Sequence, residues 1–240
     1  MPPDIVQTPD DETIVVIIPV LNEEASIGLV LSHIPKGLTT AVIVVDNGST
    51  DGTRAAAAQN GALVVEEPQR GYGAACLRGI AEAEQFTPDI VVFLDGDYSD
   101  YPEEMTELVR PIIEDHYDLV IGSRIMGHRE PGSMPIQSLL GNILVPKVIQ
   151  WLYGHKYTDL GPFRAIRYDC LIELKMADLD YGWTVEMQIK AARKKFRTID
   201  IPVQYRKRVG VSKITGTLCG AGRAAFKILW VTFSYVCRNQ

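Results

Sequence analysis

The chain has 240 residues, an ordinary apolar fraction of 46% and a net charge of −6. This length allows one large domain with an ample core, and the acidic balance argues against nucleic acid as a general partner. The four cysteines show no metal-ligand or redox spacing, and nothing near the N-terminus resembles a signal peptide. We therefore expect a protein of the reducing cytoplasm.

The N-terminal segment is polar and acidic with three prolines, which predicts a disordered tail over residues 1–12. An unbroken apolar run then predicts a buried strand over 14–18, which we expect Pro19 to end. A polar turn follows, with Asn22 near the start of a helix over about 25–34.

The same order of elements then repeats down the chain. Apolar runs predict strands, and turn residues followed by helical patterns predict helices between them. The strands are expected at 41–45, 62–65, 90–94 and 118–121, and the helices at 54–59, from the glycine-containing turn at 70–75 to about 84, and at 102–115. This alternation predicts an α/β fold with a doubly wound, mostly parallel sheet and helices on both faces.

The second half is less regular. We expect a mobile loop over 126–135 and an apolar helix over 136–153 that Pro146 interrupts. Further elements are a turn and strand within 157–166, a helix over about 170–176, a basic helix ending near 195, and a strand over 198–205 that Pro202 breaks. No linker divides the chain, so we expect one domain over 13–217.

The predicted strand at 90–94 ends in Asp95, Gly96 and Asp97. Ligands of open α/β sheets bind beyond the carboxyl ends of strands. Two carboxylates this close repel each other unless a cation lies between them, and hard oxygen ligands suit Mg²⁺ or Mn²⁺ that carries substrate phosphates. An isolated pair of this kind is also typical of an acidic turn, so the flanking segments must decide.

The charges are unevenly distributed along the chain. Residues 1–122 carry 22 acidic and 5 basic side chains, whereas residues 186–240 carry 2 and 12. The stretch 206–213 predicts a cationic loop. Residues 218–240 predict an amphipathic helix that either packs on the domain or lies at an anionic membrane surface.

Five segments, taken together, resemble family 2 glycosyltransferases of the GT-A fold. They are VIIPVLNEE, VVDNGSTDGT, GYGAA, FLDGDYSD and GSR, in that order along the chain. The resemblance implies a nucleotide-sugar donor and a site built by particular residues. The nucleotide sugar would be bound by Pro19, Val20, Asn22, Glu23, Asp46, Gly71, Asp95 and Gly96, and the Mg²⁺ or Mn²⁺ ion by Asp95 and Asp97 with help from Ser99. Asp46 can accept from a base N–H or a ribose hydroxyl, so UDP and GDP both stay open.

The second half is similar to the dolichol-phosphate mannosyltransferase and polyprenyl-phosphate glucosyltransferase branch, through the segments GPFRAI, YGWTVEM and RVGVSK. This resemblance implies a polyprenyl phosphate acceptor, bound at the inner face of the cytoplasmic membrane. The acceptor or its phosphate would be bound by Arg164, Glu186, Arg208, Ser212 and Lys213. Arg and Lys suit phosphate oxygens chemically.

The implied reaction is inverting transfer of a hexosyl group, with Asp97, Arg124, Asp159 and Arg164 as catalytic residues. A phosphate acceptor is already ionised and needs no strong base; a hydroxyl acceptor needs one, and Asp159 is the candidate. Asp159 could equally cap backbone in a turn, and Glu186 could simply pair with Arg164. Two other functions remain open at this stage: transfer to a hydroxyl acceptor, and nucleotide-sugar binding without catalysis.

Overall fold

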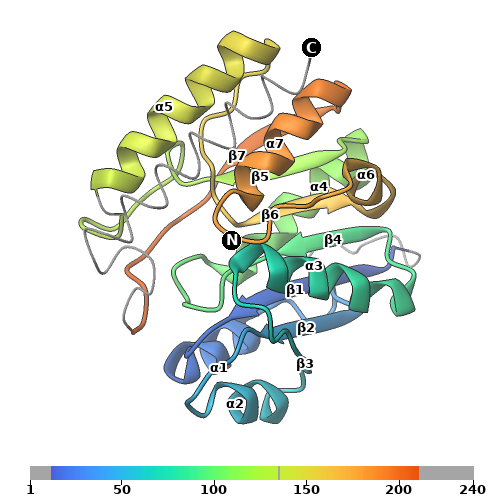
Figure 1. Cartoon of the computed structure of the whole chain (residues 1–240), viewed down its shortest axis with the longest axis vertical. Helices are drawn as coiled ribbons and strands as arrows, with labels where there is room; N and C mark the ends of the chain where they lie inside the picture. Colours follow the sequence, from blue (N-terminus) through green and yellow to red (C-terminus); the bar gives the residue numbers. More distant parts are fainter. Residues whose placement is uncertain (1–11, 135, 211–240) are drawn as a thin grey trace, which may run out of the picture.

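The computed structural model describes residues 12–134 and 136–210, which form one seven-stranded sheet flanked by helices (Figure 1). The strand order is β3-β2-β1-β4-β6-β5-β7. The strands are β1 (Ile14–Val20), β2 (Ala41–Asp46), β3 (Leu63–Glu66), β4 (Ile90–Phe93), β5 (Leu119–Ser123), β6 (Arg164–Arg167) and β7 (Thr198–Pro202). Residues 1–11 of the tail predicted over 1–12, and the C-terminal helix predicted over 218–240, lie outside the described residues.

The helices cover both faces of the sheet, as expected for a doubly wound fold. They are α1 (Glu24–His33), α2 (Thr53–Gln59), α3 (Tyr72–Ala83), α4 (Met105–Asp115), α5 (Ile136–Tyr153), α6 (Tyr168–Leu174) and α7 (Trp183–Lys194), with short 3₁₀ turns at Glu84–Phe86 and Pro102–Glu104. One core cluster joins the sheet to α3, α5, α6 and α7, and the other joins it to α1, α2 and α4. The α/β prediction is confirmed.

The central strand β1 continues through Pro19 to Val20, so the prediction that Pro19 ends it was wrong. The carbonyl of Ile17 accepts from Leu94 N, so Ile17 and Pro19 turn their backbone groups towards β4. The last paired residue of β4 is Phe93, opposite Ile17. The missing N–H of Pro19 would face β4 beyond its last paired residue. The proline therefore costs the sheet no hydrogen bond, and β1 can continue through it.

The antiparallel strand β6 was not anticipated as a sheet insertion. It lies between β4 and β5 and is antiparallel to both, while the other strand pairs are parallel. The chain enters β6 from the segment 157–163, which therefore lies at the carboxyl end of β5. This crossover brings residues such as Asp159 beside the strand ends that carry the acidic motif.

Helix α5 continues across Pro146, contrary to the predicted interruption. An interior proline costs about 3 kcal/mol. Val145 and Ile149, on either side of it, are buried in the core, and each contributes roughly 1.5–3 kcal/mol. Their packing offsets the lost backbone hydrogen bond. No helix within 12–134 and 136–210 is long and apolar enough to cross a membrane.

Candidate active site

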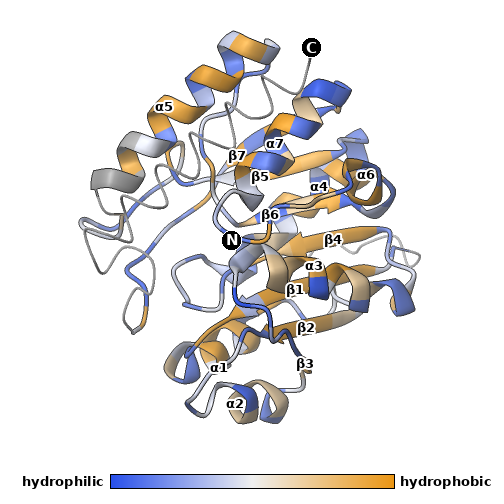
Figure 2. Ribbon diagram, viewed as in Figure 1, coloured by the Kyte–Doolittle hydropathy of each residue, from blue (hydrophilic) through white to orange (hydrophobic). Residues whose placement is uncertain are grey.

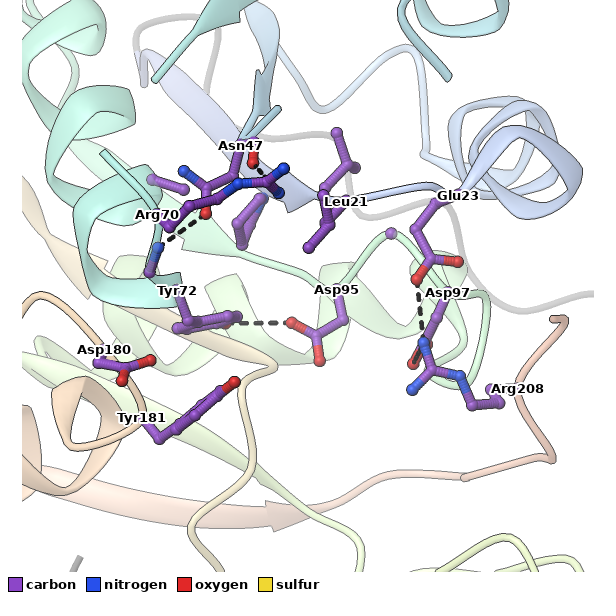
Figure 3. Close-up of a pocket in the computed structure, with 15 residues that line it drawn as sticks. Leu21, Glu23, Asn47, Arg70, Tyr72, Asp95, Asp97, Asp180, Tyr181 and Arg208 are labelled. Carbon is purple, nitrogen blue, oxygen red and sulfur yellow. Dashed lines mark hydrogen bonds and ion pairs between the residues drawn. The ribbon is translucent and has the colours of Figure 1, made fainter. Parts of the chain in front are cut away.

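A cavity of about 340 Å³ opens beyond the carboxyl ends of β1, β2 and β4 (Figure 3). Its lining comes from six separate parts of the chain. The residues are Pro19, Val20, Leu21, Glu23, Asn47, Arg70, Gly71, Tyr72, Ala75, Asp95, Gly96, Asp97, Asp180, Tyr181 and Arg208. The predicted residues Pro19, Val20, Glu23, Gly71, Asp95, Gly96, Asp97 and Arg208 are thus brought together.

Asn22 is placed differently from the expectation, because its side chain belongs to the turn and not to the cavity lining. It adopts a left-handed conformation with φ of 54°. Its Oδ1 accepts from Thr50 N at 2.8 Å, and its own N–H donates to Ser49 Oγ at 2.8 Å. Asn22 therefore ties the loop after β1 to the loop after β2.

Asp46 is buried and its carboxylate accepts from Ser49 N at 3.0 and 3.2 Å, so it stabilises the turn after β2. The cavity is lined instead by the next residue, Asn47. The side chains of successive residues along an extended chain point to opposite sides. Asp46 therefore faces the turn, and Asn47, one position later, faces the cavity. The amide of Asn47 donates to two carbonyls of the 67–69 segment and accepts from Gly71 N at 2.8 Å.

The start of α3 is pressed against the loop before α7. A Cβ at Gly71 would lie 2.0 Å from the carbonyl oxygen of Leu179, and Gly71 has φ of +143°. Ala74 N donates to the same oxygen at 3.0 Å. This contact fixes Asp180 and Tyr181 in the cavity wall on the side of Tyr72 (Figure 3).

The two acids of the motif lie at the centre and at one side of the cavity. Asp95 Oδ1 accepts from the Tyr72 hydroxyl at 3.1 Å, and Asp97 Oδ1 accepts from Ser99 N at 2.9 Å. Burial, and then the charge of Asp97, raise the pKa of Asp95 to about 7. The negative charges of Asp95 and Asp97 are therefore not fully compensated by the protein, and a bound cation would compensate them.

This donor set fits a hard divalent cation. Mg²⁺ is commonly bound by one or two carboxylates plus substrate phosphates and water. Within the described part of the chain, no group of three or more His, Cys, Asp or Glu is arranged to hold a metal ion, so Asp95 and Asp97 would share the ion with the donor phosphates. The predicted third ligand, Ser99, is buried outside the cavity lining and positions Asp97 through its N–H.

A basic strap, which we define as residues 203–210, crosses the rim beside the acidic pair. Arg208 pairs with Glu23 at 2.9 Å and with Asp97 at 3.3 Å. The strap is held by Arg206, whose guanidinium lies over the rings of Tyr98 and Tyr101 at 3.5 and 3.9 Å. The predicted phosphate-binding Arg208 thus lies directly at the cavity.

Arg124 and Asp159 form a buried pair next to the strap. Asp159 is fully buried, and its two oxygens accept from Arg124 Nε at 2.8 Å and Nη2 at 2.7 Å. The Arg124 guanidinium also lies 5.1 Å from the centre of the Tyr205 ring. Because both oxygens are engaged and neither residue lines the cavity, this geometry favours the structural role of Asp159 over that of a base.

Arg164 and Glu186 are both fully buried. Arg164 donates to the carbonyls of Gly161 and Thr184, and burial lowers its pKa. Glu186 accepts from the backbone N–H groups of Ala177 and Asp178 and pairs with Lys190 at 2.8 Å. Neither side chain is placed to meet a phosphate in the cavity; Glu186 holds the loop that carries Asp180. Ser212 and Lys213 lie outside the described residues.

Seven of the lining residues were not predicted from the sequence: Leu21, Asn47, Arg70, Tyr72, Ala75, Asp180 and Tyr181. Most are neighbours of predicted ones, so the motifs and the cavity involve the same parts of the chain. Tyr181 lines the cavity, whereas Trp183, two positions later, is fully buried in the core. Asp180 carried no signal, because its place depends on the contact between α3 and a loop about a hundred residues later.

Residues 15–175 match the family described as Glycosyl transferase family 2. The chain is 33% identical over 213 residues to an uncharacterized glycosyltransferase of Mycobacterium tuberculosis, covering 88% of this chain and 93% of the relative. It is 31% identical over 223 residues to a dolichyl-phosphate hexose transferase of Haloferax volcanii, covering 90% and 94%. The chain belongs to glycosyl transferase family 2.

The solved structures that resemble it include glucosyl-3-phosphoglycerate synthase from Mycobacterium tuberculosis in complex with Mn²⁺, UDP and phosphoglyceric acid. The TM-score is 0.74 at 26% identity, covering 93% of this chain and 78% of that one. The fold is therefore the GT-A fold, and the family makes the protein a glycosyltransferase.

Proposed function

We propose that this protein is an inverting, metal-dependent hexosyltransferase that uses a nucleotide sugar and a polyprenyl phosphate acceptor. The observation that carries the proposal is the meeting of opposite charges at one cavity: Asp95 and Asp97 on one strand end, and Arg208 of the basic strap within 3.3 Å of Asp97. The similarity to a dolichyl-phosphate hexose transferase supports the lipid phosphate as acceptor.

The cavity suits a nucleoside diphosphate at its acidic centre. A divalent cation bound by Asp95 and Asp97 would stabilise the negative charge that develops on the leaving diphosphate. Arg208 lies beside this position and can donate to phosphate oxygens as a planar fork. The N-terminal end of α3 forms the opposite wall, where Gly71 N donates to Asn47 Oδ1 and so fixes the two residues beside the donor position.

A phosphate acceptor also agrees with the buried Asp159. An acceptor phosphate oxygen is ionised and attacks the anomeric carbon without a strong base. Asp159 then serves to hold Arg124 at the edge of the site, where the guanidinium adds positive charge. The protein would act at the cytoplasmic face of a membrane, where such an acceptor is located.

A second candidate is transfer to a soluble or hydroxyl acceptor, because the structurally similar glucosyl-3-phosphoglycerate synthase was solved with phosphoglyceric acid. A hydroxyl must lose its proton during attack, so this reaction needs a carboxylate at the cavity. Asp180 lines the cavity, whereas Asp159 does not. This makes Asp180 the better candidate base for such a reaction.

The first experiment is transfer from a panel of radiolabelled nucleotide sugars, with Mg²⁺ or Mn²⁺, into a polyprenyl phosphate and into the matching polyprenol. We expect label only in the phosphate lipid. Label only in the alcohol or a soluble acceptor would reject the lipid phosphate proposal. Nucleotide-sugar binding without transfer to any acceptor would favour a binding module.

The metal assignment is tested by Asp97→Ala. We expect transfer to fall by on the order of 10²-fold or more, since metal ions contribute several kcal/mol of charge stabilisation. Mn²⁺ binding, followed by electron paramagnetic resonance, should weaken in parallel while the circular dichroism spectrum is unchanged. Asp115→Ala, at the end of α4, is the matched control. Full turnover in the Asp97 variant would remove the assignment.

A further inference from the structure

Tyr72 lies in the cavity wall and contacts one oxygen of the acidic pair. Its hydroxyl donates to Asp95 Oδ1 at 3.1 Å. In the view of Figure 3, this contact lies on the side of Asp95 away from Asp97. Asp95 is half-buried and lines the cavity, and its Oδ2 accepts a hydrogen bond from no group within the described residues. Oδ2 is therefore the oxygen that Asp95 can offer to a cation.

The packing of its ring fixes the Tyr72 hydroxyl in place. The ring lies edge-on to Trp183 with centroids 6.3 Å apart, and Trp183 lies edge-on to Phe93 at 4.7 Å. Trp183 and Phe93 are both fully buried. Figure 2 shows β4, which ends at Phe93, as a hydrophobic strand, and Asp95 follows two residues later. The Tyr72 ring and the Asp95 carboxylate are thus both anchored to the same buried strand end.

The backbone around Tyr72 is also held from two sides. Gly71 N donates to Asn47 Oδ1 at 2.8 Å, on the side of β2. Ala74 N donates to the carbonyl of Leu179 at 3.0 Å, on the side of the loop before α7. Because both its ring and its backbone are anchored by other contacts, Tyr72 cannot follow the carboxylate if that group rotates. The hydroxyl therefore restrains the carboxylate.

The second acid is restrained in a similar way, because Asp97 Oδ1 accepts from Ser99 N at 2.9 Å. With Oδ1 of Asp95 and of Asp97 both engaged, each acid presents a single oxygen to a shared ion. In an octahedral ion, this leaves the other positions to phosphate and water, the arrangement that Mg²⁺ requires. Ca²⁺ takes more oxygens in a flexible geometry and readily binds a carboxylate through both of its oxygens.

We propose that Tyr72 is a positioning residue that determines which metal ion the site accepts; this inference rests on the proposed function and deepens it. By engaging Asp95 Oδ1, the hydroxyl prevents the carboxylate from binding an ion through both oxygens. The site then favours Mg²⁺ or Mn²⁺ over Ca²⁺. Tyr72 acts on the ion only through Asp95, and removing a group that orients a metal ligand typically lowers metal affinity about 10–100-fold.

The test compares Tyr72→Phe with the unchanged full chain, using the metal ions alone. Mn²⁺ binding is followed by electron paramagnetic resonance, and Ca²⁺ binding by its competition with Mn²⁺. We expect the affinity for Mn²⁺ to fall about tenfold, while the affinity for Ca²⁺ stays the same or rises. The preference for Mn²⁺ over Ca²⁺ therefore falls about tenfold or more. A merely structural role would weaken both ions in proportion, and an unchanged preference would overturn the proposal.

Tyr168→Phe is the matched control for the loss of a tyrosine hydroxyl. Tyr72 and Tyr168 are both partly buried and pack against the same core cluster, but Tyr168 begins α6 and does not line the cavity. Both metal affinities should be unchanged in this variant. An equal loss of preference in the two variants would overturn the proposal, because the effect would then not depend on the contact with Asp95.

Infrared spectroscopy of the unchanged chain tests the proposal even if the Tyr72 variant does not fold. The symmetric and antisymmetric carboxylate stretching bands lie further apart when a metal is bound through one oxygen than through two. We expect the Mn²⁺-loaded chain to show a one-oxygen pair of bands that disappears in Asp95→Asn. A two-oxygen pair that disappears in that variant would overturn the proposal.

These measurements involve no sugar transfer, so they separate the inference from the proposed function. Absence of transfer into any acceptor would reject the proposed function, while the preference for Mn²⁺ over Ca²⁺ would still decide the role of Tyr72. Absence of Mn²⁺ binding by the unchanged chain would overturn the inference together with the metal assignment.

Discussion

Asp159 and Arg124 show how one ion pair can decide between two chemical roles. Each oxygen of Asp159 accepts from a different guanidinium nitrogen, and Asp159 Oδ2 also accepts from Arg124 N at 2.8 Å. A carboxylate held in this way orients its partner and is poorly placed to take a proton from an acceptor. Arg124 is 12% exposed and is itself held over Tyr205. The pair therefore acts as a fixed support for positive charge at the site.

We expect Asp159→Asn to lower the free energy of unfolding by about 3–5 kcal/mol, because it leaves the buried Arg124 charge uncompensated. Transfer should fall as Arg124 shifts, and the pH–rate profile should keep its shape. Chemical unfolding and the profile for a phosphate acceptor provide the measurements. In a double-mutant cycle with Arg124→Gln, the two changes should be coupled by at least about 0.5 kcal/mol. Additive effects, with loss of the acidic limb of the profile, would instead identify Asp159 as a base.

At the scale of elements, the site depends on how closely α3 approaches the loop before α7. A Cβ at Gly73 would lie 2.0 Å from the carbonyl oxygen of Asp178, just as one at Gly71 would meet Leu179. Asp178 Oδ1 in turn accepts from Asp180 N at 2.8 Å. The glycines of the GYGAA motif thus serve the packing of two elements as well as any approach of the nucleotide.

We expect Gly73→Ala to destabilise the fold by about 1–3 kcal/mol, because one of the two backbones must move. The displaced loop carries Asp180 and Tyr181, so nucleotide-sugar affinity should fall too. Thermal unfolding and calorimetric titration with the donor would measure the two effects.

Gly141→Ala is the control for that prediction, since a Cβ there would have no heavy atom within 4 Å. This helical position should gain about 0.5–1 kcal/mol from the substitution. Equal behaviour of the two variants would show that the approach at Gly73 is not limiting.

At the scale of the whole molecule, the sequence predicted most helices and strands of both halves, but not how β6 enters the sheet. The strands up to β5 are short apolar runs between turn residues, and each strand end carries a recognisable motif. Local pattern could not predict that β6 inserts antiparallel between β4 and β5, because strand order depends on contacts between distant segments.

The same limit applies to the candidate site. Motif position located Asp95, Asp97 and Glu23, but it could not tell that Asn47 and not Asp46 faces the cavity, since one residue of register exchanges the two. Motif position also could not show that the Arg164 guanidinium donates its hydrogen bonds to backbone carbonyls. Which polar groups are already satisfied is a property of the folded chain.

The buried carboxylate of Asp100 has no hydrogen-bond partner among the described residues. Burial, and then the charge of Asp95, raise its pKa well above the ordinary value. The native state therefore keeps a proton on Asp100 over a pH range in which the unfolded chain has lost it. Since stability falls with pH wherever the native state binds more protons, this residue destabilises the fold increasingly above about pH 4.

Asp100→Asn removes this titration while keeping the size of the side chain. In the presence of EDTA, we expect the melting temperature of the variant, relative to the unchanged chain, to rise as the pH increases above about 4. One pKa unit corresponds to about 1.4 kcal/mol, or about 3–6 °C for a chain of this length. Glu103→Gln, an acidic residue at the surface close by in sequence, should give parallel melting curves. Parallel curves for the Asp100 variant would mean that Asp100 is ionised in the native state, with a cationic partner such as Arg124 compensating its charge.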